Sequence, residues 1–307
     1  MLGKLYAFGG ADETGKTFSN GYVIDLIELS GWQELPPTPC QIQSSEYCRF
    51  VVHDAKAWVF RGEQAIPFFD LEKNVWNLAF TKFRDPKASW SKFFPDRGLI
   101  SYTAQVYEGK MYIFGGKSRQ HDMGRNILMA LDFADLTWEI LSGDTVATPW
   151  NNLPVIRCHT CSWVCDGKLY ITLGEVNRQG ALFEHKEYGA GNWQLEDLWK
   201  YDIATKEWTE EKTRGNVPGM RSMAASTFNP QWNRAIVFGG YSCDIPYFKA
   251  GDKQGTMFSF LGDTFMWSAE SETWSQVITR GFPSYRSCGN LHFEEVSGRT
   301  YLFGGCK

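Results

Sequence analysis

A short apolar stretch that ends in glycine recurs six times along this chain of 307 residues. A representative copy reads Tyr112-Ile-Phe-Gly-Gly116, and the final glycine is present in every copy. Successive copies lie 52, 54, 58, 66 and 65 residues apart, with the final glycine at Gly10, Gly62, Gly116, Gly174, Gly240 and Gly305. Self-similarity at this spacing indicates a repeat architecture, in which each repeat forms one unit that packs on its neighbours.

A second pattern lies downstream of the first, where a large apolar residue precedes a tryptophan by seven residues. The pairs are Phe69 and Trp76, Leu131 and Trp138, Tyr201 and Trp208, and Trp267 and Trp274. Aspartate follows the apolar residue in the first three pairs, and the first repeat has a spacing one residue longer, from Ile24-Asp25 to Trp32. Di-glycine, then apolar-Asp, then Trp resembles the kelch repeat over nearly the whole chain. The resemblance implies an all-β fold, a kelch-type β-propeller of radial sheets.

Each complete repeat reads as four antiparallel strands, called A to D from the propeller axis outwards. The chain is expected to form a single propeller domain over residues 1–307 with about six blades, from repeats at about 4–36, 45–80, 99–142, 157–213, 221–279 and 286–307. The first repeat lacks strand A and the last stops after strand B, so both terminal blades are expected to be incomplete. Because strand B occurs in both, the two do not add up to one blade, and we expect the chain to be a fragment of a longer protein.

Composition restricts the partners and the compartment. The net charge is −4 and no run of lysine and arginine occurs, which argues against nucleic acid as a partner. No stretch approaches the roughly 18 apolar residues of a membrane span, and no secretory signal opens the chain. The eight cysteines are unevenly spaced and predict reduced thiols rather than a disulfide framework. We therefore expect a cytoplasmic or nuclear protein that does not bind membranes.

One face of the predicted propeller carries the long connections. In a four-stranded antiparallel blade, the B–C loops and the D–A connections emerge on the same face. The B–C loops over Lys117–Asn126, Glu175–Asp197 and Tyr241–Asp263 are long, and so is the D–A connection Thr81–Gly98. Long loops in compact domains more often serve function than connection. This face is therefore the expected binding face.

Three arginines recur on that face in the pattern Pro-x-x-Arg, each just before an innermost strand: Arg157, Arg221 and Arg286. The matching residues of the second and third repeats are Ser45 and Leu99. In kelch propellers that bind acidic peptides, arginines at this position line the peptide pocket, and the resemblance implies the same role here. We expect the guanidinium groups to meet around the channel mouth, partly open to solvent, with Trp90, Phe93 and Tyr247 as hydrophobic rims. The alternative is that each arginine ties its loop to backbone carbonyls or to an acidic neighbour.

One segment of the chain carries a pattern that is typical of metal sites. Cys158-His159-x-Cys161-x3-Cys165 has a spacing that suggests zinc. On a strand, however, these ligands would spread over roughly 20 Å, with Cys158 on the opposite side from His159, so no metal and no cofactor are expected. No histidine follows a tyrosine, as a galactose-oxidase-like copper site needs, and the Glu-x3-Asp-x3-His iron pattern of plant specifier kelch proteins is absent. Glu184-His185-Lys-Glu187 is typical of a solvated charged loop, and no catalytic residue is assigned.

Two functions remain. The leading one is a protein-interaction module or scaffold, which binds a partner protein or an acidic peptide on the long-loop face and presents it to further domains of the same polypeptide. The alternative is a propeller enzyme, an oxidase, hydrolase or lyase-like protein, that uses the long loops around the channel mouth. A cavity with two or more buried carboxylates or histidines of perturbed pKa would favour the enzyme. An open face rich in basic and aromatic residues would favour binding.

Overall fold

The computed structural model describes residues 3–306 except residues 13, 15, 39–47, 119, 122, 145–146, 148–149, 177–192, 248–254, 279 and 282. Of residues 243–247 and 255–258 only the backbone is described. Within these residues the chain is almost entirely β, and its helix is the four-residue α1 (Trp90–Phe93). No helix of the described residues is long and apolar enough to cross a membrane.

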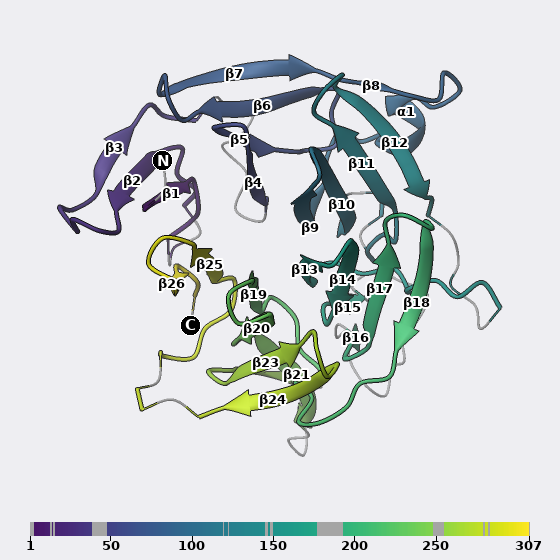
Figure 1. Cartoon of the computed structure of the whole chain (residues 1–307). Coiled ribbons are helices and arrows are strands. Elements are labelled where there is room, and N and C mark those ends of the chain that lie inside the picture. Colours follow the sequence, from purple (N-terminus) through teal and green to yellow (C-terminus); the bar gives the residue numbers. More distant parts are fainter. Residues whose placement is uncertain are drawn as a thin grey trace.

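The sheets stand around a common axis, with one strand of each sheet innermost (Figure 1). The first sheet has three strands, β1 (Lys4–Phe8), β2 (Gly21–Asp25) and β3 (Gln33–Leu35). The second has four, β4 (Phe50–His53), β5 (Lys56–Val59), β6 (Ala65–Asp70) and β7 (Val75–Phe80). The third contains β9 (Ile100–Tyr107), β10 (Lys110–Lys117), β11 (Leu128–Asp132) and β12 (Thr137–Ser142), and the short β8 (Lys82–Phe83) pairs in parallel with β12.

Two more four-stranded sheets and a hairpin complete the ring. The fourth sheet is β13 (Cys161–Cys165), β14 (Lys168–Thr172), β17 (Leu198–Asp202) and β18 (Glu207–Glu211). The fifth is β19 (Ala225–Asn229), β20 (Arg234–Phe238), β23 (Thr264–Ser268) and β24 (Thr273–Val277). The hairpin of β25 (Asn290–Glu294) and β26 (Arg299–Phe303) holds the sixth position, next to the first sheet (Figure 1). The predicted β-propeller is confirmed; in the described residues five sheets have three or more strands, and the sixth position is held by the two-stranded hairpin.

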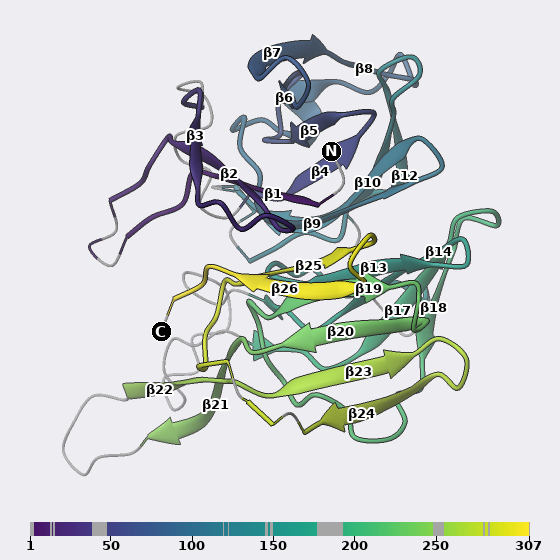
Figure 2. The same ribbon diagram turned by 60° about the vertical axis from the view of Figure 1, so that its left-hand side comes forward.

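The fourth and fifth repeats carry an additional hairpin in their B–C loops. β15 (Glu175–Val176) pairs with β16 (Trp193–Gln194), and β21 (Tyr241–Tyr247) pairs with β22 (Gly255–Phe260). Figure 2 shows that β21 and β22 project well beyond the body of the fifth blade. The face with the long loops is therefore built up by paired strands, and not only by irregular connections.

The repeated glycine has two structural uses. The final glycines all have positive φ, between 78° at Gly62 and 108° at Gly10, which disfavours any residue with a Cβ. Three of them also donate a backbone hydrogen bond to the next blade: Gly116 to the carbonyl oxygen of Arg157 at 3.0 Å, Gly174 to that of Arg221 at 3.0 Å, and Gly240 to that of Arg286 at 2.9 Å. A Cβ on Gly240 would lie 2.6 Å from the carbonyl oxygen of Ser222. The glycine therefore allows two backbones to approach closely where neighbouring blades join.

The repeated tryptophan packs one blade on the one before it. Trp76 contacts Phe8 and Trp208 contacts Phe114, with ring centroids 5.2 and 5.3 Å apart. Trp138 is fully buried against Phe60, at 4.9 Å. The phenylalanine in each contact stands two residues before the final glycine of its repeat. The two repeated sequence patterns thus meet at the blade-to-blade interfaces, as expected for a propeller core.

Candidate functional site

Two of the predicted arginines are buried in ion pairs inside their own blades. Arg157 is fully buried, and its Nη1 and Nη2 each donate to the Asp197 carboxylate at 2.6 Å. Arg221 is 4% exposed and donates to the Asp263 carboxylate at 2.5 and 3.1 Å. Bidentate pairs of this kind fix the geometry of both partners. Each arginine anchors its D–A connection to the residue that precedes strand C of the same blade.

The two aspartates occur only where the arginine does. The carbonyl oxygen of Asp263 accepts a hydrogen bond from Gly239 N–H, and that of Ile127 accepts one from Gly115 N–H, so these residues hold equivalent positions. The repeat of Ile127 has Leu99 in place of the arginine. An apolar pair therefore replaces the ion pair in the third blade. The aspartates were missed in the sequence, although their pairing with the Pro-x-x-Arg repeats was visible there.

The positive charge of Arg157 affects the pKa of Asp197. Burial raises the pKa of the Asp197 carboxyl, but the Arg157 guanidinium group, through its charge and its hydrogen bonds, outweighs this and lowers the pKa below its ordinary value. The Nε1–H of Trp199 donates a further hydrogen bond to the same carboxylate at 2.8 Å. Asp197 is therefore ionised at neutral pH and fully engaged within its blade.

Arg286 is bound differently. Its Nη1 donates to the carbonyl oxygen of Gly304 at 2.9 Å, and its Nη2 donates to the hydroxyl of Ser284 at 3.0 Å. Within the described part of the chain, Arg286 forms no ion pair, and its side chain is half-buried. Of the three predicted arginines, it is the one whose guanidinium group is not neutralised by a carboxylate there.

The expectation that all three guanidinium groups are open to solvent around one channel mouth is wrong for Arg157 and Arg221, because the aspartates hold them inside their blades. That the arginines contact a partner stays a prediction. Trp90 and Phe93 are half-buried in α1, where both pack against Phe83 with ring centroids 4.6 and 5.6 Å away. The side chain of Tyr247 lies outside the described residues.

The Pro-x-x-Arg segments expose other residues. Met220, which precedes Arg221, is 37% exposed, and Tyr285, which precedes Arg286, is 56% exposed. Val155, in the segment of Arg157, is 38% exposed. Each segment thus presents a large apolar side chain next to or near its arginine on the long-loop face. We refer to Val155, Met220 and Tyr285 as the apolar arc.

A small cavity lies where the innermost strands begin. Its volume is about 60 Å³, and Ser101, His159, Met223 and Cys288 line it, together with Cys48, Arg49, Tyr102 and Asn290. The first four occupy one repeat position, two residues after Arg or Leu99, and all have left-handed backbone with φ between 54° and 59°. His159 N–H donates to Ser101 C=O at 2.8 Å, and Cys288 N–H donates to Met223 C=O at 2.9 Å. A repeated backbone conformation thus turns one side chain per blade toward the axis.

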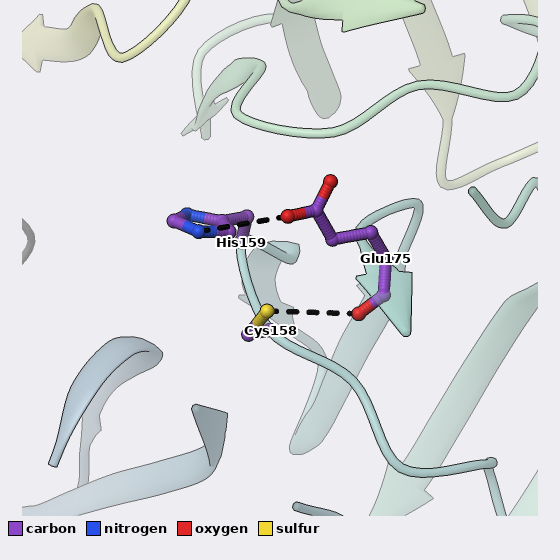
Figure 3. A group of neighbouring side chains, drawn as sticks. All are labelled: Cys158, His159 and Glu175. Carbon is purple, nitrogen blue, oxygen red and sulfur yellow. Dashed lines mark hydrogen bonds and ion pairs between the residues drawn. The ribbon is translucent and has the colours of Figure 1, made fainter. Parts of the chain in front are cut away.

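His159, which lines this cavity, also belongs to a cluster of three different chemical groups with Cys158 and Glu175 (Figure 3). Cys158 and Glu175 exchange backbone hydrogen bonds at 2.9 and 3.0 Å, and His159 Nε2 lies 3.8 Å from Glu175 Oε1. Burial lowers the pKa of His159 to about 3, so its imidazole is neutral, and burial raises the pKa of the Cys158 thiol to about 12. Glu175 was not considered as a partner of these residues in the sequence, because it lies 16 residues beyond His159 in a different strand.

Comparison with known proteins identifies the family to which this propeller belongs. The family model of the KLHDC2/KLHL20/DRC7 Kelch-repeats domain matches residues 68–305. The chain belongs to this kelch-repeat family. The resemblance seen in the sequence is thereby confirmed, and with it the assignment of the di-glycine and tryptophan patterns to kelch blades.

Several relatives share most of the chain at low identity. Kelch domain-containing protein 3 of Homo sapiens is 22% identical over 98% of this chain and 74% of its own length. Host cell factor 2 of Homo sapiens is 25% identical over 80% of this chain, which spans only 33% of that protein. The N-(sulfonatooxy)prop-2-enimidothioate sulfolyase of Thlaspi arvense is 25% identical over 72% of this chain and 57% of its own length. The solved structure of YjhT superimposes with a TM-score of 0.64 at 14% identity, covering 95% of this chain and 84% of that one, and shares the fold.

Proposed function

We propose that this kelch propeller is a protein-interaction module that binds its partner on the long-loop face. The observation that carries the proposal is the apolar arc, which the anchored Pro-x-x-Arg segments present beside the B–C loops. Kelch domain-containing relatives and a host cell factor support an interaction scaffold in general. Large exposed side chains such as Met220 and Tyr285 can supply much of the binding energy when they lie at the centre of an interface.

The position of the arc favours this face over the opposite one. Tyr285 lies against the end of a B–C loop, since a Cβ on Gly262 would be 3.2 Å from Tyr285 Cα. The hairpin of β21 and β22 rises from the same blade (Figure 2). A partner seated on the arc would therefore contact the D–A connections and the B–C loops together. Arg286 forms no ion pair in the described residues, and its guanidinium group would donate hydrogen bonds to an Asp, Glu or phosphate group of that partner.

An enzyme is the second candidate, and one observation favours it: a relative named as a sulfolyase. The Glu-x3-Asp-x3-His iron pattern is missing from this chain. One histidine of perturbed pKa, His159, lines the described cavity, which falls short of the two or more buried perturbed carboxylates or histidines expected of an enzyme. The geometry supports binding better than catalysis.

The test compares the removal of exposed apolar side chains from the long-loop face with their removal from the opposite face. Proteins captured from cell extract by the wild-type chain are identified, and affinity for the most enriched partner is then measured with purified proteins. The double variant Met220→Ala/Tyr285→Ala should weaken binding at least tenfold, because truncated anchors at interface centres typically cost ~2 kcal/mol or more. The matched control is Trp232→Ala/Val296→Ala, which truncates side chains 55% and 57% exposed in the A–B turns on the opposite face. Unchanged affinity in the first double variant, or equal loss in both, would refute the proposed face.

The acidic component of the partner is tested separately. Arg286→Ala should lose affinity, and Arg286→Lys should recover part of it at low salt only, because lysine keeps the charge but not the planar fork. If both variants bind as the wild type does, the partner does not place an acidic group on Arg286, while the apolar arc remains testable through the double variant.

A further inference from the structure

The cluster of Cys158, His159 and Glu175 is not part of the proposed binding face. Its candidate ligand atoms are a thiol sulfur, an imidazole nitrogen and a carboxylate oxygen, all within 4.8 Å of one another. All three residues are buried, with exposures of 0%, 7% and 1%. The arrangement was not expected from a strand carrying Cys158 and His159 alone. The left-handed backbone of His159, with φ of 56°, breaks the strict alternation of sides there.

The backbone holds two of the three residues rigidly. Cys158 and Glu175 form an antiparallel bridge, which is possible because Gly174 lies beside it: a Cβ on Gly174 would be 2.6 Å from the Cys158 carbonyl oxygen. The same bridge recurs in the next repeats as Ser222 with Tyr241, and as Ser287 with Cys306. Of these three bridges, only the first combines a thiol with a carboxylate and a neighbouring histidine.

Glu175 is oriented by the following blade. Its Oε2 accepts a hydrogen bond from the Ser222 hydroxyl at 2.7 Å and a short one from the Tyr241 hydroxyl. Its Oε1 faces His159 Nε2 instead (Figure 3). A metal-binding carboxylate commonly has one oxygen held in this way by outer hydrogen bonds while the other is left for the ion.

Glu175 is a buried carboxyl group with no basic side chain beside it in the described residues. Buried carboxyl groups in proteins are normally hydrogen-bonded, paired with a cation or bound to a metal. In the part of the chain that the structure describes, no lysine or arginine lies within ion-pair distance of Glu175. Its side chain is 1% exposed and therefore almost closed to bulk water. A divalent ion between the three groups would supply the cation that this buried carboxyl group lacks there.

We propose that Cys158, His159 and Glu175 form a zinc site with three protein ligands, whose fourth position opens toward the central cavity. Thiolate, imidazole and carboxylate are the ligands that Zn²⁺ takes, and three protein ligands with one open position is a recurrent arrangement. Tetrahedral coordination puts ligand atoms about 3.3–3.6 Å apart, so separations that now reach up to 4.8 Å would shorten by about 1.5 Å or less on binding. His159 lines the cavity, which provides the path of entry. On binding, the Cys158 thiol loses its proton to water and the sulfur bonds to the metal.

Cobalt provides the direct test, because a thiolate bound to Co²⁺ gives an intense charge-transfer absorption that carboxylate and imidazole ligands do not. The full chain, stripped of metal with a chelator, is titrated with Co²⁺ and then with Zn²⁺ under reducing conditions. The expected result is a tetrahedral spectrum with the thiolate band at about one equivalent, displaced by Zn²⁺. Zn²⁺ should also raise the melting temperature of the wild type.

Variants separate this cluster from the neighbouring thiols. Cys158→Ser should abolish the charge-transfer band, and Glu175→Gln and His159→Ala should each weaken Zn²⁺ binding at least tenfold. Tyr241→Phe, which removes only an outer hydrogen bond, should weaken it about 10–100-fold or less. The matched controls are Cys161→Ser and Cys165→Ser, whose buried sulfur atoms instead lie near the Ala224 carbonyl oxygen and Asn233. Both should keep the band.

Three outcomes would overturn the proposal: no stoichiometric Co²⁺ or Zn²⁺ binding by the wild type, a thiolate band that persists in Cys158→Ser, or a band lost in Cys161→Ser. If Cys158→Ser fails to fold, the proposal is still tested by the wild-type titration, which must show stoichiometric binding, and by Glu175→Gln, which must weaken Zn²⁺ binding. The proposal is independent of the binding face, because the apolar arc is not part of the cluster.

Discussion

The indole ring of Trp32 packs against the phenyl ring of Phe303, with 5.2 Å between ring centroids. This contact joins the first sheet to the hairpin of β25 and β26 (Figure 1). It repeats the contact of Trp76 with Phe8 between the first two blades. In the described residues β1 pairs only with β2, and β26 only with β25, so no shared strand closes the ring there. The junction is made by the packing pattern of the repeat itself.

This junction is expected to be weaker than the others. Trp32 is 43% exposed and Phe303 is 38% exposed, whereas Trp138 is fully buried. Trp32→Ala should therefore lower the free energy of unfolding by about 1–2 kcal/mol, against about 3–5 kcal/mol for Trp138→Ala. Urea unfolding measures both. Amide exchange should accelerate in residues 3–35 and 290–306 of Trp32→Ala and stay unchanged in β13 and β14. Equal losses in the two variants would show that the junction is as firmly packed as a complete blade interface.

The pair of Arg221 and Asp263 gives a second prediction. Removing the arginine leaves Asp263, whose side chain is 29% exposed, without its partner, so Arg221→Leu should destabilise the chain by about 1–3 kcal/mol. Arg221→Leu/Asp263→Ile copies the apolar pair of Leu99 and Ile127 in the third blade. That double variant should recover most of the loss, because it removes both charges together. Urea unfolding of the full double-mutant cycle gives the coupling free energy.

An exposed ion pair serves as the control for that cycle. Lys206 Nζ lies 2.6 Å from Glu139 Oε1, but its side chain is 54% exposed. Lys206→Ala should therefore change the free energy of unfolding by less than about 1 kcal/mol. A double variant of Arg221 and Asp263 no more stable than the single one would mean that the ion pair is irreplaceable in its blade.

The glycines at the blade junctions give a third prediction. Gly240 has positive φ and no room for a Cβ, whereas Gly109 has positive φ but nothing within 4 Å of a Cβ. Gly143 has neither constraint. Gly109→Ala should cost about 1 kcal/mol for backbone strain, and Gly240→Ala should cost more because the backbones must separate. Gly143→Ala should be neutral or slightly stabilising. Thermal melting of the three variants should give this order; similar melting temperatures would assign no special role to the close approach.

Much of the fold was predictable because the residues that make the contacts between blades recur at fixed positions of the sequence repeat. The phenylalanine two residues before the final glycine meets a repeated tryptophan at four junctions, and at the fifth, where the fourth repeat has Thr172 instead, Trp274 packs against Trp163. The aspartates before the C–D turns were also predictable, since Asp202 accepts hydrogen bonds from the N–H groups of Ala204 and Thr205 at 3.0 and 2.9 Å. Local rules of turn chemistry cover such contacts.

The site was harder to predict because it depends on pairs that are distant in the sequence. Arg157 pairs with Asp197 and His159 faces Glu175, and neither relationship follows from strand alternation. The arginines were recognised as a repeat, but the direction of their side chains depends on an aspartate at the end of a loop whose length differs between repeats. Similarly, the positive φ of His159 belongs to a conformation that recurs at Ser101, Met223 and Cys288, four residue types that do not reveal it in the sequence.

The last prediction concerns acid stability and follows from Asp197. Burial raises the pKa of this carboxyl, but Arg157 outweighs that effect, so the pKa in the folded chain is below the ordinary 3.8. The unfolded chain therefore binds the proton more readily, and the stability that the pair contributes is present above pH 3.8 and is lost as the pH falls through the folded pKa. Asp197→Asn should be less stable than the wild type at pH 7, and the difference should shrink below about pH 4. In Arg157→Leu, burial, which raises the pKa of Asp197, is opposed only by hydrogen bonds such as that from Trp199, so the stability that Asp197 contributes above pH 3.8 should become smaller. Urea unfolding between pH 3 and 7 measures all three chains, and parallel curves would show that Arg157 does not control the charge of Asp197.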